Sequence, residues 1–194
     1  MSTDLRPLLL TGLILLASAR TTVASDPDET TLLGRSGVVK TGRLAKFIAK
    51  PVAPAFDLPD IPANDPTVAG ATIKFYERGN PSNANTFALP AFQWTKRGDP
   101  FNPTAFRYRG TGLLADPCRK VLVKARTVRA TCKGAPITLN PPFVSATLGV
   151  TLTIGTSKRY CPVYGAKRNE AGLFTSIPTI NGAAPCSPSG AFVD

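Results

Sequence analysis

The chain has 194 residues, of which 43% are hydrophobic and 18% charged, so it can bury the core of one ordinary domain and is not disordered throughout. Its formal net charge is +11, and it contains no histidine. The missing histidines exclude Ser-His and Cys-His nucleophile pairs and histidine-based metal triads.

Residues 1–25 have the order of a secretory signal peptide. An apolar run from Leu8 to Ala17 precedes small residues, and cleavage is expected after Ala19 or after Ser25. The run is too short to cross a bilayer, because a spanning helix needs about twenty apolar residues. We expect a secreted chain, periplasmic or extracellular, with no transmembrane segment in its mature part.

Residues 26–66 are expected to hold two short strands and a proline-rich connector. The acidic stretch from Asp26 to Thr31 is predicted to be disordered. Apolar pairs on both sides of Gly42 favour two strands around a turn, although residues 44–50 also fit a basic helix of the kind that lies on membranes. The prolines between Pro51 and Pro66 predict an extended connector, whose aspartates lack the spacing of a calcium loop.

Residues 67–194 are expected to form the main β-domain. A turn of helix is expected around Trp94, and Pro162 is expected to place its strand at an edge or a bulge. The tail from Phe174 is rich in Pro, Gly and Ser, and only Cys186 is expected to hold it. Strands are predicted over residues 69–76, 86–89, 105–109, 118–133 (two strands), 144–154 and 159–164. Short strands with Gly and Pro turns predict a mostly β fold, an antiparallel β-sandwich or alternatively a β-barrel.

The clearest strand pattern runs from Val144 to Ile154. Its apolar residues alternate with polar or small ones over the whole stretch, which a helix would not show. The expected buried side consists of Val144, Ala146, Leu148, Val150, Leu152 and Ile154.

The segment Cys118–Lys133 predicts a hairpin with its turn at Ala125-Arg126. That turn places Val121, Val123, Val128, Ala130 and Cys132 on one face and basic or hydroxyl side chains on the other. It conflicts with a simple cross-strand bond from Cys118 to Cys132, so Cys118 is expected to lie outside the ladder.

Four cysteines in an exported chain imply two disulfides. Three connectivities are possible, and among them we favour Cys118 with Cys132 and Cys161 with Cys186, because short loops close most readily. Their spacing does not fit a zinc site.

The excess of positive charge lies in residues 67–194, which favours anionic partners. We predict that a basic stripe on the hairpin binds an anionic polysaccharide or the envelope surface. The stripe consists of Lys120, Lys124, Arg129 and Lys133, with Arg126 at the turn. The alternative is generic charge on a solvated sheet. There is no nucleic-acid fold signature.

A second candidate surface is aromatic. Tyr76, Phe92, Trp94 and Tyr108 would stack on sugar rings or bases, with Lys96, Arg97, Arg107 and Arg109 near them in sequence. The alternative is that the large rings form the core.

Several stretches resemble a group of uncharacterised exported proteins from environmental bacteria. They are Asp65-Pro66-Thr67 with Gly70-Ala71, Phe87–Ala91 with Trp94, Phe106–Arg109, Cys118–Lys124, Thr131–Gly134 and Lys158–Cys161. The resemblance spans residues 32–188 and implies a secreted, cysteine-paired β-domain. It implies no activity.

The sequence predicts no catalytic centre, cofactor or metal. Glu77, Asp99, Asp116 and Glu170 are expected to be surface charges rather than a hydrolase pair. Ser157 and Lys158 are adjacent, so on a strand they point to opposite faces. We therefore expect a non-enzymatic exported binding or surface protein, or alternatively a self-assembling structural component of the envelope.

Overall fold

The computed structural model describes residues 29–52, 55–59 and 61–178, and the structural statements below concern these residues. The predicted signal peptide and Cys186 lie outside them. The expected mostly β fold is confirmed, because the described residues form one 11-stranded sheet with only two short helical turns.

The strand order in the sheet is β4-β3-β9-β10-β11-β1-β2-β8-β7-β6-β5. The pairings are antiparallel, apart from a parallel stretch between β1 and β10. In chain order the elements are β1 (Glu29–Lys40), β2 (Leu44–Pro51), the helix α1 (Pro66–Ala69), β3 (Ala71–Glu77), β4 (Asn80–Leu89), the 3-10 helix η1 (Ala91–Gln93), β5 (Trp94–Gly98), β6 (Pro103–Tyr108), β7 (Cys118–Lys124), β8 (Thr127–Lys133), β9 (Thr147–Ile154), β10 (Lys158–Glu170) and β11 (Leu173–Ser176).

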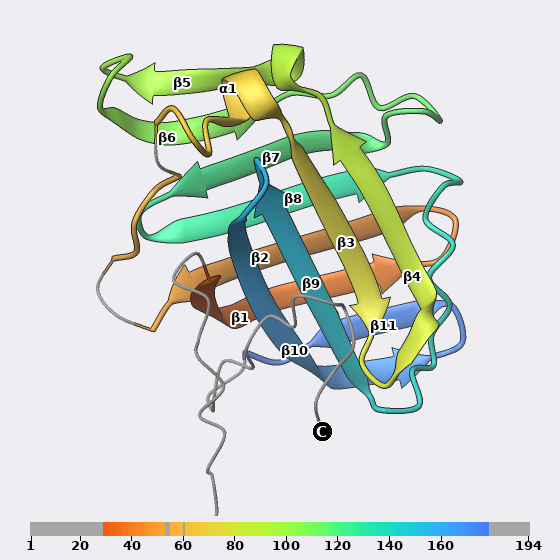
Figure 1. The fold of residues 1–194 in the computed structure, drawn as a ribbon. Coiled ribbons are helices and arrows are strands. Elements are labelled where there is room, and N and C mark those ends of the chain that lie inside the picture. Colours follow the sequence, from red (N-terminus) through yellow and green to blue (C-terminus); the bar gives the residue numbers. More distant parts are fainter. Residues whose placement is uncertain (1–28, 53–54, 60, 179–194) are drawn as a thin grey trace, which may run out of the picture.

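The sheet curls into a half-barrel around one hydrophobic core. In Figure 1, β3, β4 and β9 cross in front of β2, β7 and β8. Phe47 of β2 meets Phe75 of β3 with ring centroids 6.0 Å apart, and it meets Tyr164 of β10 at 6.4 Å. All three rings are fully buried, so strands that are distant in the sheet order share one core.

The curl occurs at the long strand β10. Its first part pairs with β9 and its second part with β11, and a register shift separates Ala166 from Arg168. Pro162 lies in the first part, opposite Leu32 of β1. The prediction of an edge or bulge at Pro162 is wrong, because this strand has partners on both sides and the β9 register is the same before and after the proline.

β1 and β2 are interior strands of the same sheet. They pair across the Gly42 turn, so the two predicted strands are confirmed and the helix over 44–50 is excluded. The predicted disorder is wrong from Glu29 to Thr31, because these residues pair with Arg159 to Cys161 of β10. A neighbouring strand satisfies the backbone of this polar stretch, which local composition does not reveal.

The predicted hairpin is confirmed as β7 and β8, with Lys124 opposite Thr127 across the turn. Cys118 lies directly opposite Cys132 and is bonded to it, so the first predicted disulfide is also confirmed. Cys118 is therefore inside the ladder and not outside it. A register shift between Cys118 and Lys120 makes Arg119 an extra residue in β7. Because of this extra residue, Cys118 can lie opposite Cys132 although the turn is at Ala125-Arg126.

The second predicted pairing stays a prediction, since Cys186 lies outside the described residues. Cys161 is buried and is not a free thiol.

Two ends of predicted elements differ from expectation. β9 begins at Thr147, and Val144 is 93% exposed because the chain turns there. The Val144 N–H donates to the buried carboxylate of Glu77, and Ala146 takes a positive φ of 50°. The Pro/Gly/Ser-rich tail begins with a strand rather than a loop, since Phe174 of β11 is fully buried.

Candidate functional site

The outer face of five neighbouring strands carries a set of cations. Side chains alternate along β2, β8, β7, β6 and β5, so each strand buries its apolar residues and turns the polar ones to solvent. We call the resulting surface the basic face. Its members are Lys46, Arg97, Arg107, Lys120, Lys124 and Arg129.

Strand register places these residues side by side. Arg129 lies opposite Leu122, and Leu122 lies opposite Arg107, so two guanidinium groups flank one leucine. Directly opposed residues have Cβ atoms about 5 Å apart. The next row on one side holds Lys46, Thr131 and Lys120, and the next row on the other side holds Thr127, Lys124, Ala105 and Arg97.

Two grooves lie on this face. The first has a volume of about 270 Å³, and its lining includes Lys46, Arg107, Lys120 and Arg129. The second has a volume of about 380 Å³, and its lining includes Arg97, Arg107, Lys124 and Arg129. Leu122, Arg107 and Arg129 belong to both, so the grooves meet at the centre of the face.

The basic face has no compensating negative charge of its own. β2, β5, β6, β7 and β8 contain no aspartate or glutamate, and no ion pair between described residues involves a member of the face. Partial desolvation, followed by the charges of Arg109, Arg97 and Arg129, lowers the pKa of Arg107. Even so, arginine stays protonated in proteins, so the face keeps its positive charge at neutral pH.

The structure brings three of the five predicted site residues together. Lys120, Lys124 and Arg129 lie on the basic face. Arg126 is exposed at the β7–β8 turn, and Lys133 is exposed at the far end of β8, opposite Leu44.

Sequence reasoning did not assign the other three members to this face. Lys46 belongs to β2, which is remote in sequence, although its alternation with Phe47 was a usable signal. Arg97 and Arg107 were assigned to the aromatic surface.

The structure excludes the candidate aromatic platform and confirms, for three of its four rings, the alternative in which the large rings form the core. Trp94, Tyr76 and Tyr108 are buried, and only Phe92 is largely exposed, at 84%. The Trp94 Nε1–H donates to the carbonyl of Leu89, and its ring lies 5.4 Å from that of Tyr108. These rings fill the core because they supply large apolar areas.

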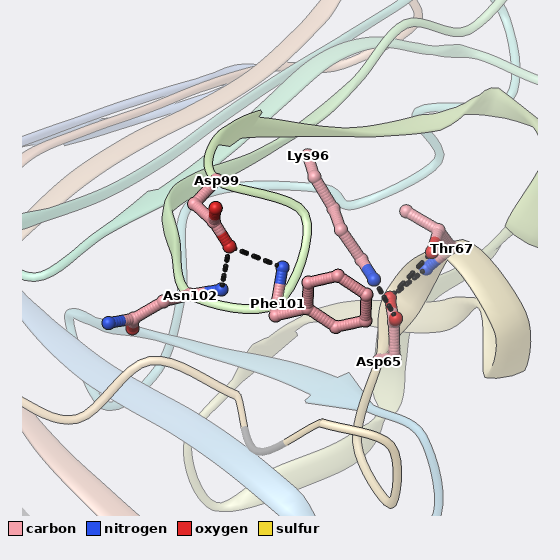
Figure 2. A network of polar contacts seen from close by, with 6 residues as sticks. All are labelled: Asp65, Thr67, Lys96, Asp99, Phe101 and Asn102. Atoms are coloured by element: carbon pink, nitrogen blue, oxygen red, sulfur yellow. Dashed lines mark hydrogen bonds and ion pairs between the residues drawn. The ribbon is translucent and has the colours of Figure 1, made fainter.

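Lys96, predicted near that platform, points to the opposite side of β5 from Arg97. Its ammonium lies 2.6 Å from Asp65 Oδ2, and Asp65 Oδ1 accepts from the backbone and hydroxyl of Thr67 at the start of α1 (Figure 2). Burial would raise the pKa of Asp65, but the hydrogen bonds from Lys96 and Thr67 outweigh it and hold that pKa low. This pair ties α1 to β5 and leaves Lys96 unavailable to a ligand on the basic face.

The four carboxylates in residues 67–178, the described part of the main domain, each have structural partners. Glu77 is only 2% exposed, so the prediction of a surface charge is wrong there; it accepts from Asn80, Asn83 and Val144. Exposed Asp99 accepts from the backbone N–H groups of Phe101 and Asn102 (Figure 2), and Glu170 pairs with Arg168.

The remaining polar candidates are also occupied. Ser157 Oγ donates to Asn64 Oδ1, and Lys158 is buried beside it. Within the described ranges no three His, Cys, Asp or Glu side chains gather closely enough to hold a metal ion.

Asp116 is the most heavily bonded of the carboxylates. Its Oδ1 accepts from the Tyr108 hydroxyl at 2.7 Å, and its Oδ2 accepts from Gln93 Nε2 and from the N–H and hydroxyl of Thr111. Burial works against the charged form, but these hydrogen bonds outweigh it and lower the pKa of Asp116.

We expect Asp116→Asn to lower the free energy of unfolding at pH 7 by about 1–3 kcal/mol, since both oxygens of Asp116 accept hydrogen bonds and asparagine keeps only one of them. The folded pKa is depressed, so the contribution is complete above the unfolded pKa of about 4 and is lost as the pH falls through the folded value. The difference between wild type and variant should therefore shrink in acid. Urea unfolding of wild type and variant at pH 7 and at acid pH measures this difference.

Asp99→Asn is the matched control, because only Oδ1 of Asp99 accepts and an asparagine oxygen replaces it. Equal losses in the two variants at pH 7 would contradict the role given to Asp116.

No protein-family model, curated protein or solved structure matches the chain. The resemblance to exported cysteine-paired proteins therefore stays a prediction. None of the helices in the described ranges has the length and apolar character needed to traverse a membrane.

Proposed function

We propose that this chain is an exported binding protein that holds an anionic polysaccharide, or another anionic polymer of the cell envelope, on its basic face. One observation carries the proposal: the register places Arg107 and Arg129 on either side of Leu122, inside a cationic surface whose strands contain no acid. The disulfide between Cys118 and Cys132 supports export, since such bonds persist in oxidising compartments.

The arrangement suits an extended polymer better than a small ligand. The two grooves share Arg107, Leu122 and Arg129, and their cations come from five strands rather than from one loop. A chain of sulfate, phosphate or carboxylate groups laid across the strands would contact successive cations and release its counterions. Arginine donates bidentate hydrogen bonds to such groups, which favours Arg107 and Arg129 as the central contacts.

The triple variant Arg107→Gln, Lys120→Gln, Arg129→Gln is expected to elute from a heparin column at a much lower salt concentration than wild type. Each cation removed should reduce the slope of log affinity against log salt by about 0.7–0.9, if heparin behaves as a nucleic-acid strand does. Exposed substitutions cost within about 0.5 kcal/mol each, so the urea midpoint should change little. Salt-gradient elution and urea titration are the measurements.

The control removes the same charge elsewhere, with Lys40→Gln, Arg43→Gln and Lys167→Gln, all at exposed positions. It should elute close to wild type. If the two triple variants elute at the same salt concentration, net charge alone explains the retention on heparin and the proposal is wrong.

A further inference from the structure

The loop between β6 and β7 holds two leucines in solvent. Leu113 is 68% exposed and Leu114 is 75% exposed, and Ala115 beside them is exposed as well. The Asp116 N–H donates to the carbonyl of Leu113 at 3.0 Å, so these residues form a tight turn at the tip. We call this turn the apolar tip. Single exposed leucines are common, whereas two adjacent exposed leucines at the end of a turn form an apolar patch, and such patches mark candidate interaction sites.

The apolar tip is held rigidly. Asp116 fixes both sides of the loop by accepting from Tyr108, Thr111 and Gln93, and its backbone carbonyl accepts from Gly112 at 3.0 Å. The Thr111 hydroxyl also accepts from the Leu113 N–H at 3.3 Å. A loop fixed in this way does not collapse its leucines onto the protein, and it loses little conformational entropy when it docks.

The base of the loop is fixed as well. The Gly110 N–H donates to the carbonyl of Arg119, and the Lys133 N–H donates to the carbonyl of Pro117. Gly112 has a φ of 77°, and the Arg119 side chain lies over it, with Nε 2.5 Å from where a Cβ would stand. The disulfide between Cys118 and Cys132 closes the same end of the hairpin.

Three cationic residues lie at the base of the loop. Arg109 begins it, Arg119 lies over Gly112, and Lys133 is hydrogen-bonded at its base; all three are exposed. We call these three residues the cationic collar. The carboxylate inside the loop, Asp116, has both oxygens occupied by donors. An apolar projection with positive charge at its base complements an anionic lipid surface, which offers hydrocarbon beneath a layer of negative headgroups.

We propose that the apolar tip inserts into an anionic bilayer, with the cationic collar at the headgroups. A lipid surface fits better than a protein, because the apolar area is only one turn wide, whereas a stable protein interface buries about 800 Å² on each partner. This proposal does not rest on polymer binding by the basic face, with which the apolar tip and the cationic collar share no residue.

Sedimentation with phosphatidylcholine vesicles, with and without phosphatidylglycerol, tests the proposal on the exported chain. Wild type should bind the vesicles that contain phosphatidylglycerol. The double variant Leu113→Ser, Leu114→Ser should lose about tenfold to a hundredfold in affinity. Neutralising Arg109, Arg119 and Lys133 to glutamine should cost about fivefold per charge on the anionic vesicles alone.

A fluorescence measurement reports the insertion itself. Trp94, the single tryptophan, is 4% exposed, so the tryptophan added by Leu114→Trp supplies the signal that changes. Its emission should shift to the blue when anionic vesicles are added.

The matched control Phe101→Ser, Val144→Ser removes two other exposed apolar side chains and should bind as wild type does. The leucine variant should still elute from heparin as wild type does, and the basic-face variant made together with Leu114→Trp should still give the blue shift, so the two proposals can fail separately. Undiminished vesicle binding by the leucine variant, no blue shift, or a wild-type dimer that this variant makes monomeric would overturn the insertion.

Discussion

Replacing Gly34 with alanine is expected to lower the free energy of unfolding by about 3 kcal/mol, near the upper end of overpacking costs. Gly34 is buried in β1 between β2 and β10. A Cβ atom there would overlap the backbone carbonyl oxygen of Val163 and would lie 2.5 Å from Cδ1 of Tyr164. The carbonyl cannot move without disturbing the pairing of β1 with β10, and the Tyr164 hydroxyl is hydrogen-bonded to Ile48.

Gly165→Ala is the control, since it makes the same change in the neighbouring strand β10. The nearest atom to a Cβ at that position is Cγ1 of Ile177, 3.9 Å away. The substitution should be neutral or should stabilise by up to about 1 kcal/mol, because it restricts the unfolded chain. Urea unfolding of both variants gives the comparison, and similar midpoints would disprove the close contact at Gly34.

Removing the disulfide with Cys118→Ala and Cys132→Ala is expected to cost about 3 kcal/mol, because the bridge closes a short loop and restricts the unfolded chain. Both cysteines are fully buried, so the lost sulfur contacts add to this. The urea midpoint should fall, and hydrogen exchange in the loop at residues 109–117 should become faster, since the bridge lies at its base.

Treating wild type with reductant provides the control for the disulfide. The midpoint should fall on reduction, and at the same reductant concentration the double variant should fall by less, because it has already lost this bridge. A double variant that unfolds at the wild-type midpoint would show that the hairpin needs no covalent link.

Sequence patterns predicted the features that depend on neighbouring residues alone. The partition of the hairpin into a buried and a basic side follows from alternation around one turn, and the structure confirms it. The extra residue Arg119 could not be predicted, because a bulged arginine looks like any other residue of a strand. Val144 and Ala146 continue the alternation of β9 but leave the strand, because the distant carboxylate of Glu77 captures the Val144 N–H.

Only half of the basic face was predicted, because only three of its six members belong to one hairpin. Lys120, Lys124 and Arg129 belong to one hairpin, so their common face is readable from spacing. Lys46 and Arg107 join them only because β2 pairs with β8 and β6 pairs with β7. Periodicity assigns a residue to a side of its own strand, whereas the neighbouring strand is chosen by the whole core.

The position of β1 in the sheet determines when the chain can fold. β1 precedes the other described strands in the chain, yet the strands on its far side are β10 and β11, which come last among the described strands. A nascent chain that ends at β9 has unpaired edges at both β1 and β9, and such edges recruit other strands. Completion of the core therefore waits until residues 158–176 have been made, so the strands made before them stay without their final partners until then.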